Sequence, residues 1–374
     1  MRSSRAVRAS GTPAGDPAAT PSIYEVARVA GLSVATVSRA LNDKGPVRAE
    51  TRQRVLDAVE RLGYVPHSAA RMLSTRKTMS IGVLLPDMHG AFFSEIVRGI
   101  DLAARAAGYH LLVSGSHSDA AETAALLQTL HGRVDGLILM APALGGAWLQ
   151  KALPRRVPVV LINDDGTDGR HDSLRIDNRR GARLAVEHLL ALGHRAVAFL
   201  GGPEGNADAA ERLAGYREAL VAAGLPLSRH LELAGDFGEE SGLQAGAKVA
   251  ALVPRPTAIF AANDAMAIGC LAALREHNLR VPEDLSLVGF DDVPIARYLT
   301  PALTTVQVPI AELGRQAMAC LLSSIDGRPE NPEGAANHTV IAPTLAIRAS
   351  AAAPAEAPKK HETSRTPTQR RTST

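Results

Sequence analysis

Residues 33–39 read SVATVSR and bring together side chains that suit a base edge in the DNA major groove. Short side chains let a backbone approach the bases, while hydroxyl and guanidinium groups hydrogen-bond to base edges or phosphates. We expect Val34, Ala35 and Thr36 to touch bases and Arg39 to reach a guanine edge or a phosphate. The residues of this region expected to contact DNA are Ser33, Val34, Ala35, Thr36, Ser38, Arg39 and Asn42.

Two short helices joined by a turn would present that surface. Apolar residues recur at helical spacing over 23–30, and Gly31 can adopt the left-handed conformation that ends a helix. The Ser33 hydroxyl can cap the second helix by accepting a hydrogen bond from a backbone N–H of its first turn. Val37 and Leu41 then face the first helix. This pattern predicts a helix-turn-helix, and the alternative is an αα-hairpin within a larger bundle.

A third helix is predicted over residues 50–62, ending at Gly63. Its apolar side consists of Val55, Leu56, Val59 and Leu62. The three helices make a headpiece, in which Asn42 and the start of the third helix are expected to grip the DNA backbone. Pro66 can then occupy the first turn of a further short helix.

Polar and aromatic residues follow several short apolar runs of parallel-strand type. Ligands of parallel α/β sheets bind outside the carboxyl ends of the strands, so these residues are candidates for a binding site. They are Asp87, Phe92, Phe93, Asn163, Asn263, Asp264 and Asp291. A turn equally explains Asn163, and Asp264 can instead cap the next helix. Paired carboxylates also suit acid–base catalysis, but no nucleophile–base pair, Walker loop or GxGxxG motif accompanies them.

Alternation of strands and helices predicts two doubly wound α/β lobes. The expected strands are 81–85, 109–113, 136–140, 159–162, 196–200, one near 231, 258–262 and 285–290. The expected helices are 92–107, 120–131, 147–153, 211–223, 241–253 and 265–277. Asn206 and Asp208 are expected in the loop before the helix that contains Arg212.

The motifs VARVAGLSVATVSRALN, TRQRVLDAVERLGYVPHSAARML and IGVLLPD resemble the LacI/GalR family of bacterial transcription regulators. The resemblance extends with weaker identity to about residue 348. It implies an all-α helix-turn-helix headpiece plus hinge helix, then an α/β periplasmic-binding-protein-like core of two doubly wound lobes. The chain would cross between the lobes three times, with 304–308 leading back to the first lobe and 312–325 packing there. A last strand near Leu345 would rejoin the second lobe.

These patterns predict the domain organisation. The expected segments are a disordered extension 1–20, the headpiece 21–63, a hinge helix and linker 64–77, the core 78–350 and a disordered basic tail 351–374. Within the core, the first lobe is expected to comprise mainly 78–176 plus 306–326, and the second mainly 177–305 plus 338–348.

The resemblance also implies how the effector cleft is lined. Arg212 matches an arginine that reaches into the family's effector site, and Phe237 is placed like an aromatic residue that walls the pocket in purine-binding members. The family uses the positions of Asn263, Asp264 and Asp291 for sugar hydroxyls or a similar polar edge. The effector contacts expected in all are Asp87, Phe92, Phe93, Asn163, Asp208, Arg212, Phe237, Asn263, Asp264 and Asp291. Gly90 and Ala91 replace the usual Asn-Pro, which leaves the shape of that loop open.

The mechanism implied is a homodimeric repressor on a pseudo-palindromic operator. Leu73 corresponds to the leucine that wedges into the central minor-groove step, with Ala70 beside it. A sugar or sugar acid is the expected effector, acting as an inducer; a purine acting as corepressor is the alternative. A sugar-binding carrier without a DNA role is less favoured because the headpiece is fused to the core.

Charge and composition agree with this organisation. Residues 21–77 hold ten basic against five acidic residues, whereas 78–350 carry a net charge of −7, so attraction to phosphates concentrates at the headpiece. Cys270 and Cys320 lie in apolar helical runs and are expected to be buried free thiols. No signal peptide or membrane-spanning run is visible, so we expect a cytoplasmic protein without membrane contact, metal or cofactor.

Overall fold

The computed structural model describes residues 21–41, 46–64, 77–164, 170–327 and 336–355. The chain divides into two units, Met1–Thr78 and Met79–Thr374. Three of the expected DNA contacts, Asn42, Ala70 and Leu73, lie outside the described residues, as do most of the expected hinge, the N-terminal extension and the end of the C-terminal tail.

The first unit is a three-helix headpiece made of α1 (Ile23–Ala30), α2 (Val34–Leu41) and α3 (Ala49–Leu62). One valine from each helix, Val26, Val37 and Val55, is fully buried at their junction. Leu56, which we expected to join this core, is 47% exposed, and Ala58 is buried instead. The correction follows from helical geometry, because positions 55 and 58 lie on one face of α3 whereas position 56 is rotated about 100° from position 55.

Local signals fix the ends of α1. Ser22 and Glu25 form a capping box that satisfies free donors at the start of the helix. Gly31 ends it with a φ of 63°, a left-handed conformation that glycine adopts without steric cost.

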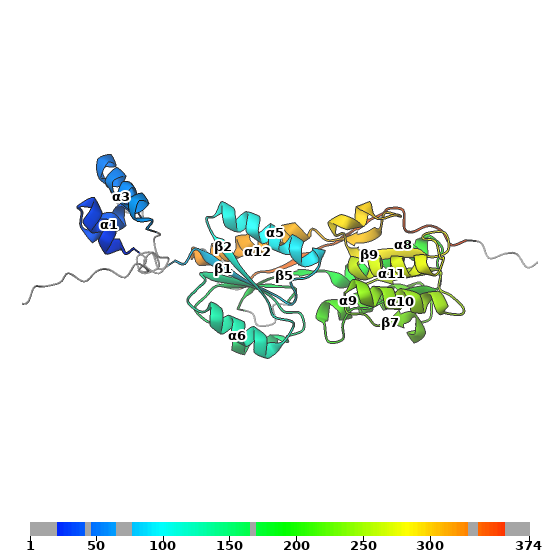
Figure 1. Ribbon diagram of the computed structural model, residues 1–374. Coiled ribbons are helices and arrows are strands. Elements are labelled where there is room, and N and C mark those ends of the chain that lie inside the picture. Colours follow the sequence, from blue (N-terminus) through cyan, green and yellow to red (C-terminus); the bar gives the residue numbers. More distant parts are fainter. Residues whose placement is uncertain (1–20, 42–45, 65–76, 165–169, 328–335, 356–374) are drawn as a thin grey trace, which may run out of the picture. The chain divides into compact units, whose positions relative to one another are not determined.

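The second unit contains two parallel α/β lobes, which Figure 1 shows side by side. The first-lobe sheet has the order β11-β5-β4-β3-β1-β2, and all of its strands are parallel. Its strands are β1 (Ser80–Leu85), β2 (His110–Gly115), β3 (Gly136–Met140), β4 (Val159–Ile162), β5 (Asp172–Ile176) and β11 (His338–Ile341). Its helices are α5 (Ala91–Ala106), α6 (Ala120–Leu130), α7 (Gly146–Ala152) and α12 (Ile310–Ile325).

The second-lobe sheet has the order β12-β10-β9-β8-β6-β7, in which β12 alone runs antiparallel to its neighbour. Its strands are β6 (Val197–Leu200), β7 (Glu232–Leu233), β8 (Ala258–Ala261), β9 (Ser286–Asp291), β10 (Thr304–Gln307) and β12 (Thr344–Ala346). Its helices are α8 (Asn178–Ala191), α9 (Ala207–Ala222), α10 (Glu239–Ala251) and α11 (Asp264–Glu276), with short 3₁₀ segments at Arg229–Leu231 and Pro294–Tyr298.

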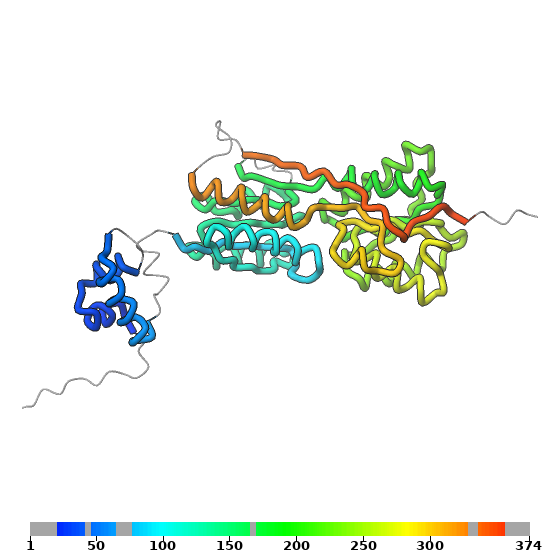
Figure 2. Tube along the Cα trace, turned by 90° about the horizontal axis from the view of Figure 1, so that it is seen from above, coloured from blue at the N-terminus to red at the C-terminus, as the bar shows by residue number. Residues whose placement is uncertain are grey.

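The chain crosses between the lobes three times, but β10 extends the second lobe beyond the boundary expected at residue 305, and β11 belongs to the first lobe and not, as expected, to the second. Residues 304–307 form a strand of the second sheet before the chain passes to α12 in the first lobe. Residues 338–341 pair with β5 in the first sheet, and the second lobe is rejoined only by β12. Figure 2 shows the C-terminal chain running along both lobes. Hydrogen bonding between distant strands decides these memberships, and a short apolar run does not encode it.

Helices α5 and α12, which are far apart in the sequence, pack closely on one face of the first sheet (Figures 1 and 2). Glycines make the approach possible: a Cβ at Gly99 would lie 1.9 Å from the carbonyl oxygen of Ala311, and one at Gly314 would lie 2.4 Å from that of Ile96. The two backbones therefore touch where any side chain would collide.

Several elements differ from the sequence prediction. β5 and α8 were not expected, and α9 begins at Ala207 rather than at residue 211. Asn206 causes the earlier start, because its side chain caps the helix by accepting from the N–H of Ala209. Asp208 consequently lies within the first turn of α9 and not in a loop.

The segment after Ser350 is ordered further than expected. The hydroxyl of buried Ser350 donates to the carbonyl of Leu287, and the Ala352 backbone bonds with the Ser286 hydroxyl and with Nε2 of His194. We call residues 350–352 the C-terminal strap. Ser350 fastens it beside β9, so residues 351 and 352, which we expected to belong to a disordered tail, are held against the second lobe.

Both cysteines are free, but only Cys270 is fully buried, whereas Cys320 is half-buried. Among the described residues, none of the helices has the length and apolar character needed to span a lipid bilayer.

Candidate functional site

The exposed face of α2 carries the residues expected to read DNA. Ser33 caps the helix: its hydroxyl accepts from the N–H of Thr36 at 3.2 Å and lies 2.9 Å from the Thr36 hydroxyl. Ala35 and Arg39 are exposed, and Nε of Arg39 donates to the carbonyl of Ala35. Val34 and Ser38 are half-buried, and Val34 packs against the headpiece core. Part of the Val34 side chain is therefore used to hold α2 in place.

Two arginines of α3 hold the other helices by their C-terminal carbonyls, a role that the sequence pattern did not reveal. Nη2 of Arg54 donates to the carbonyl of Ala30 at 2.6 Å, and Nη1 of Arg52 donates to that of Ala40 at 3.2 Å. Carbonyls at a helix end lack partners within the helix, and a cation there also opposes the helix dipole. These bonds fix α1 and α2 against α3.

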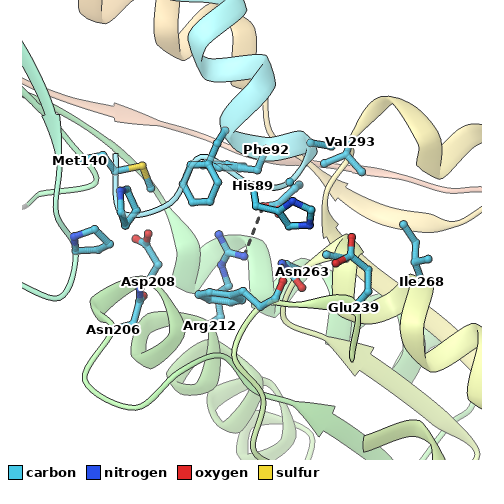
Figure 3. Close-up of a pocket in the computed structure, with 18 of the residues that line it drawn as sticks. His89, Phe92, Met140, Asn206, Asp208, Arg212, Glu239, Asn263, Ile268 and Val293 are labelled. Atoms are coloured by element: carbon cyan, nitrogen blue, oxygen red, sulfur yellow. Dashed lines mark hydrogen bonds and ion pairs between the residues drawn. The ribbon is translucent and has the colours of Figure 1, made fainter. Parts of the chain in front are cut away.

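A cavity of about 150 Å³ lies between the two lobes, at the carboxyl ends of strands from both sheets (Figure 3). The first lobe contributes Pro86, His89, Gly90, Ala91, Phe92, Phe93, Met140 and Pro142. The second lobe contributes Asn206, Asp208, Arg212, Phe237, Glu239, Asn263, Ala265, Ile268, Asp291, Val293 and Ile295. Apolar walls with a few polar groups are typical of small-molecule sites.

Arg212 is the cationic group of this cavity, and Figure 3 shows it extending from the second lobe toward Phe92 and His89. It is 4% exposed. Its Nε donates to the side-chain oxygen of Asn178 at 2.8 Å, and its Nη1 donates to the carbonyl of Ala262 at 2.5 Å. The contacts of the described residues leave Nη2 without a protein partner, so that nitrogen can donate to a ligand.

The same guanidinium is held by aromatic stacking and by an ion pair. Its central carbon lies 3.8 Å from the centre of the Phe290 ring and 5.5 Å from that of Phe237. Nη1 lies 3.5 Å from Oδ1 of Asp291. These contacts hold the Arg212 guanidinium in one orientation before a ligand binds.

Asp291 ends β9 in an unusual state. Its backbone has a φ of 112°, a conformation that side chains rarely adopt, and strain of this kind gathers at binding sites. Burial raises the pKa of its carboxyl to about 7, a shift that the positive charge of Arg212 only partly offsets. Oδ1 of Asp291 is buried and accepts no hydrogen bond in the described structure, which leaves an acceptor for a ligand donor.

Asp208 is held by two asparagines that do not themselves line the cavity. Nδ2 of Asn163, from the first lobe, donates to Oδ2 at 2.7 Å, and Nδ2 of Asn178 donates to Oδ1 at 2.8 Å. Asn178 thus joins Asp208 to Arg212, because its oxygen accepts from that guanidinium. We expected Asn163 to contact the effector, but it lies behind Asp208 and does not line the cavity.

Aromatic rings close the cavity from both lobes. Phe92 and Phe93 meet edge to face, with their ring centres 5.5 Å apart. Phe237 has a φ of 72°, and its ring occupies the place that a Cβ on Gly202 would take. Asn263 supports that loop: its Nδ2 donates to the carbonyl of Phe237 at 2.8 Å, and its oxygen caps α11.

Two other expected contacts are not part of the cavity. Asp87 is exposed and accepts from the backbone N–H of His89, so it shapes the loop that carries His89. Asp264 is fully buried, where it accepts from the N–H of Val293 and the hydroxyl of Thr305. Burial and the nearby charge of Asp291 raise its pKa well above the usual range. Sequence cannot separate such a buried structural carboxyl from one that faces a ligand.

The structure adds lining residues that sequence reasoning missed. His89 and Glu239 are the ionisable ones, and Met140, Pro142, Ile268, Val293 and Ile295 supply apolar wall. Glu239 is the first residue of α10, two residues after Phe237, and that proximity was the available signal.

Family models match both units of the chain. Residues 22–67 match the model described as bacterial regulatory proteins, lacI family, and residues 186–351 match a periplasmic binding protein-like domain.

Complete proteins and a solved structure are similar over most of the chain. The HTH-type transcriptional regulator GalR of Escherichia coli K12 is 34% identical over 343 residues, 91% of this chain and 99% of the relative. The HTH-type transcriptional repressor PurR of Erwinia tasmaniensis is 36% identical over 314 residues, 83% of this chain and 92% of the relative. The lac repressor dimer bound to operator and the anti-inducer ONPF superposes with a TM-score of 0.80 at 31% identity, covering 90% of this chain and 100% of that chain.

Proposed function

Because this chain belongs to the lacI family of bacterial regulatory proteins, we propose that it is a homodimeric repressor whose operator affinity is set by a small molecule in the interlobe cavity. The protein is a DNA-binding transcriptional regulator and not an enzyme. We place it in the cytoplasm, on the nucleoid DNA.

Each headpiece lays α2 in a major groove, and two headpieces need two half-sites, so the operator is pseudo-palindromic. The contacts to DNA are those assigned from the sequence: Ser33, Val34, Ala35, Thr36, Ser38, Arg39 and Asn42. Leu73 of each protomer enters the central minor-groove step, with Ala70 beside it. Such a wedge costs about a few kcal/mol of unstacking, which the closer fit of both headpieces offsets. Similarity to the lac repressor dimer bound to operator supports operator binding by a dimer.

The effector is a hydroxylated small molecule, either a sugar or a sugar acid. One observation carries this proposal: the buried Arg212 has free donors at Nη2, and its Nη1 lies 3.5 Å from Oδ1 of Asp291, a buried oxygen that accepts no hydrogen bond in the described structure. Neighbouring hydroxyls satisfy both, since each can donate and accept. A purine is the rival, favoured by the rings of Phe92, Phe93 and Phe237 and by similarity to a repressor named PurR.

Effector binding shifts a population between two core arrangements that differ in operator affinity. A ligand can shift this balance only by its own preference for one arrangement. The cavity meets that requirement because its lining comes from both lobes, so any relative movement of the lobes changes the contacts of the ligand.

The first experiment is selection of bound sequences from random duplex DNA by the purified full-length chain, repeated with sugars, sugar acids or purines added. We expect one palindromic site whose recovery changes with sugars or sugar acids. A response to purines alone would favour the rival, and the absence of any enriched site would overturn the repressor proposal. Asp291→Ala should retain the site and lose the ligand response.

The wedge is tested by Leu73→Ala. We expect specific operator binding to weaken far more than non-specific binding, because only the kinked operator uses the wedge. Equal losses on operator and random DNA would contradict the role of Leu73.

A further inference from the structure

The interlobe cavity carries more negative than positive groups. Among the described residues that line it, three carry carboxylates, Asp208, Glu239 and Asp291, and one carries a guanidinium, Arg212; His89 is the remaining ionisable one. An entering carboxylate or phosphate is repelled by such a lining, whereas a hydroxyl or an ammonium group is not.

Arg212 does not offset this excess of negative charge, because its guanidinium is already paired with protein groups. The guanidinium donates to two oxygens, pairs with Asp291 and stacks on Phe290. What remains is the Nη2 donor, which a neutral hydroxyl satisfies as well as an anion does. The arginine therefore gives direction to a hydrogen bond and little net attraction for negative charge.

A buried acceptor of the cavity also favours a ligand that donates a hydrogen bond over one that carries an acid group. Oδ1 of Asp291 lacks a hydrogen-bond donor and is buried. Above its pKa of about 7 the Asp291 carboxylate is ionised, so an acid group placed against it brings another acceptor and leaves two oxygens without a proton between them. An alcohol or an amine supplies the missing donor.

Glu239 is the carboxylate with freedom to act on a ligand. Asp208 is held by two asparagines and Asp291 by Arg212, whereas the Glu239 side chain has no hydrogen-bond or ion-pair partner among the described residues. It lies opposite the equally unpartnered His89 ring, on the other lobe (Figure 3). Its charge can thus meet a ligand without any internal contact being broken.

We propose that the cavity binds hydroxylated or aminated ligands without negative charge, and that Glu239 is a specificity-determining residue that excludes acids. This inference rests on the proposed function and narrows it, because it removes sugar acids from the effector class. The preferred ligand presents a donor to Asp291 and another hydroxyl or an ammonium group toward Glu239.

The test compares matched ligands on the full-length chain by isothermal titration at pH 8. The panel contains glucose, glucosamine and glucuronate, with the corresponding galactose and mannose sets. In the set that binds, we expect the acid to bind at least tenfold more weakly than the neutral or amino member. Glu239→Gln should reduce this preference about fivefold, the size expected for one exposed charge.

Glu240→Gln is the matched control, because Glu240 occupies the same first turn of α10 but bonds to Gln244 and does not line the cavity. It should leave the preference unchanged. An acid that binds wild type as well as its neutral partner would overturn this inference while leaving the ligand-controlled repressor intact. Equal effects of the two variants would remove Glu239 as the determinant. If no panel member binds, the sugar proposal and this inference fall together.

Discussion

Asp291 joins three properties at one residue: burial, a left-handed backbone and an ion pair without a hydrogen bond. Each is unfavourable for the folded state, and together they mark a carboxylate kept for a purpose other than stability. The proposed ligand supplies the hydrogen-bond donor that Oδ1 of Asp291 lacks in the folded chain.

A pH dependence of stability follows from the raised pKa of Asp291. A carboxyl whose pKa is about 7 in the folded state holds its proton more tightly than in the unfolded chain, where the pKa is near 4. Stability should therefore fall as pH rises from about 4 to about 7 and level off above that. Asp291→Asn should reduce the loss between pH 5 and pH 8 by about 2 to 3 kcal/mol in urea titrations. Parallel pH profiles for the two proteins would contradict this assignment.

The sequence shows which residue types stand at strand ends but not which of them are buried. Arg212, Phe237 and Asp291, all expected to contact the effector, line the cavity. Asp264 does not, because a carboxyl that bonds inside the lobe follows a strand just as one that faces a ligand does. Glu239 was missed because the helix that carries it begins two residues earlier than expected.

Among the elements, the crossing of α5 and α12 carries a clear prediction. Gly99→Ala places a Cβ against the carbonyl of Ala311, which is backbone and cannot rotate away. We expect the first lobe to lose about 1 to 3 kcal/mol by overpacking, despite the better helix propensity of alanine. Gly145→Ala is the control: no atom lies near its Cβ, and its φ of −64° suits alanine. Equal midpoints of denaturation would show that the two helices can separate without cost.

Periodicity located most helices and buried strands to within a few residues, since their apolar faces are read directly from the sequence. It failed for β5, whose run DSLRI holds only two apolar residues. It also failed to give the sheet membership of residues 304–307 and 338–341. The strand at 338–341 is defined by a partner far along the chain, since His338 pairs with Ser173, and a local pattern does not encode such pairing.

For the whole molecule, linkage between the ligand and DNA gives a quantitative prediction. If the ligand lowers operator affinity by some factor, saturation with operator must lower ligand affinity by the same factor, typically between about 5 and 150. Fluorescence anisotropy with labelled operator and calorimetry with free ligand measure the two sides. If the ligand releases operator but its own affinity is the same with and without operator, the ligand does not act through binding to this protein.

The two lobes are completed by segments between residues 304 and 352. The first lobe is incomplete without α12 and β11, and the second is incomplete without β10, β12 and the C-terminal strap. During synthesis the headpiece can fold as soon as it leaves the ribosome, because all three of its helices come first. The core cannot, because both sheets lack strands and the first lobe lacks α12 until residues 304–346 have been made. A nascent chain of this kind therefore exposes its DNA-reading part long before the part that controls it.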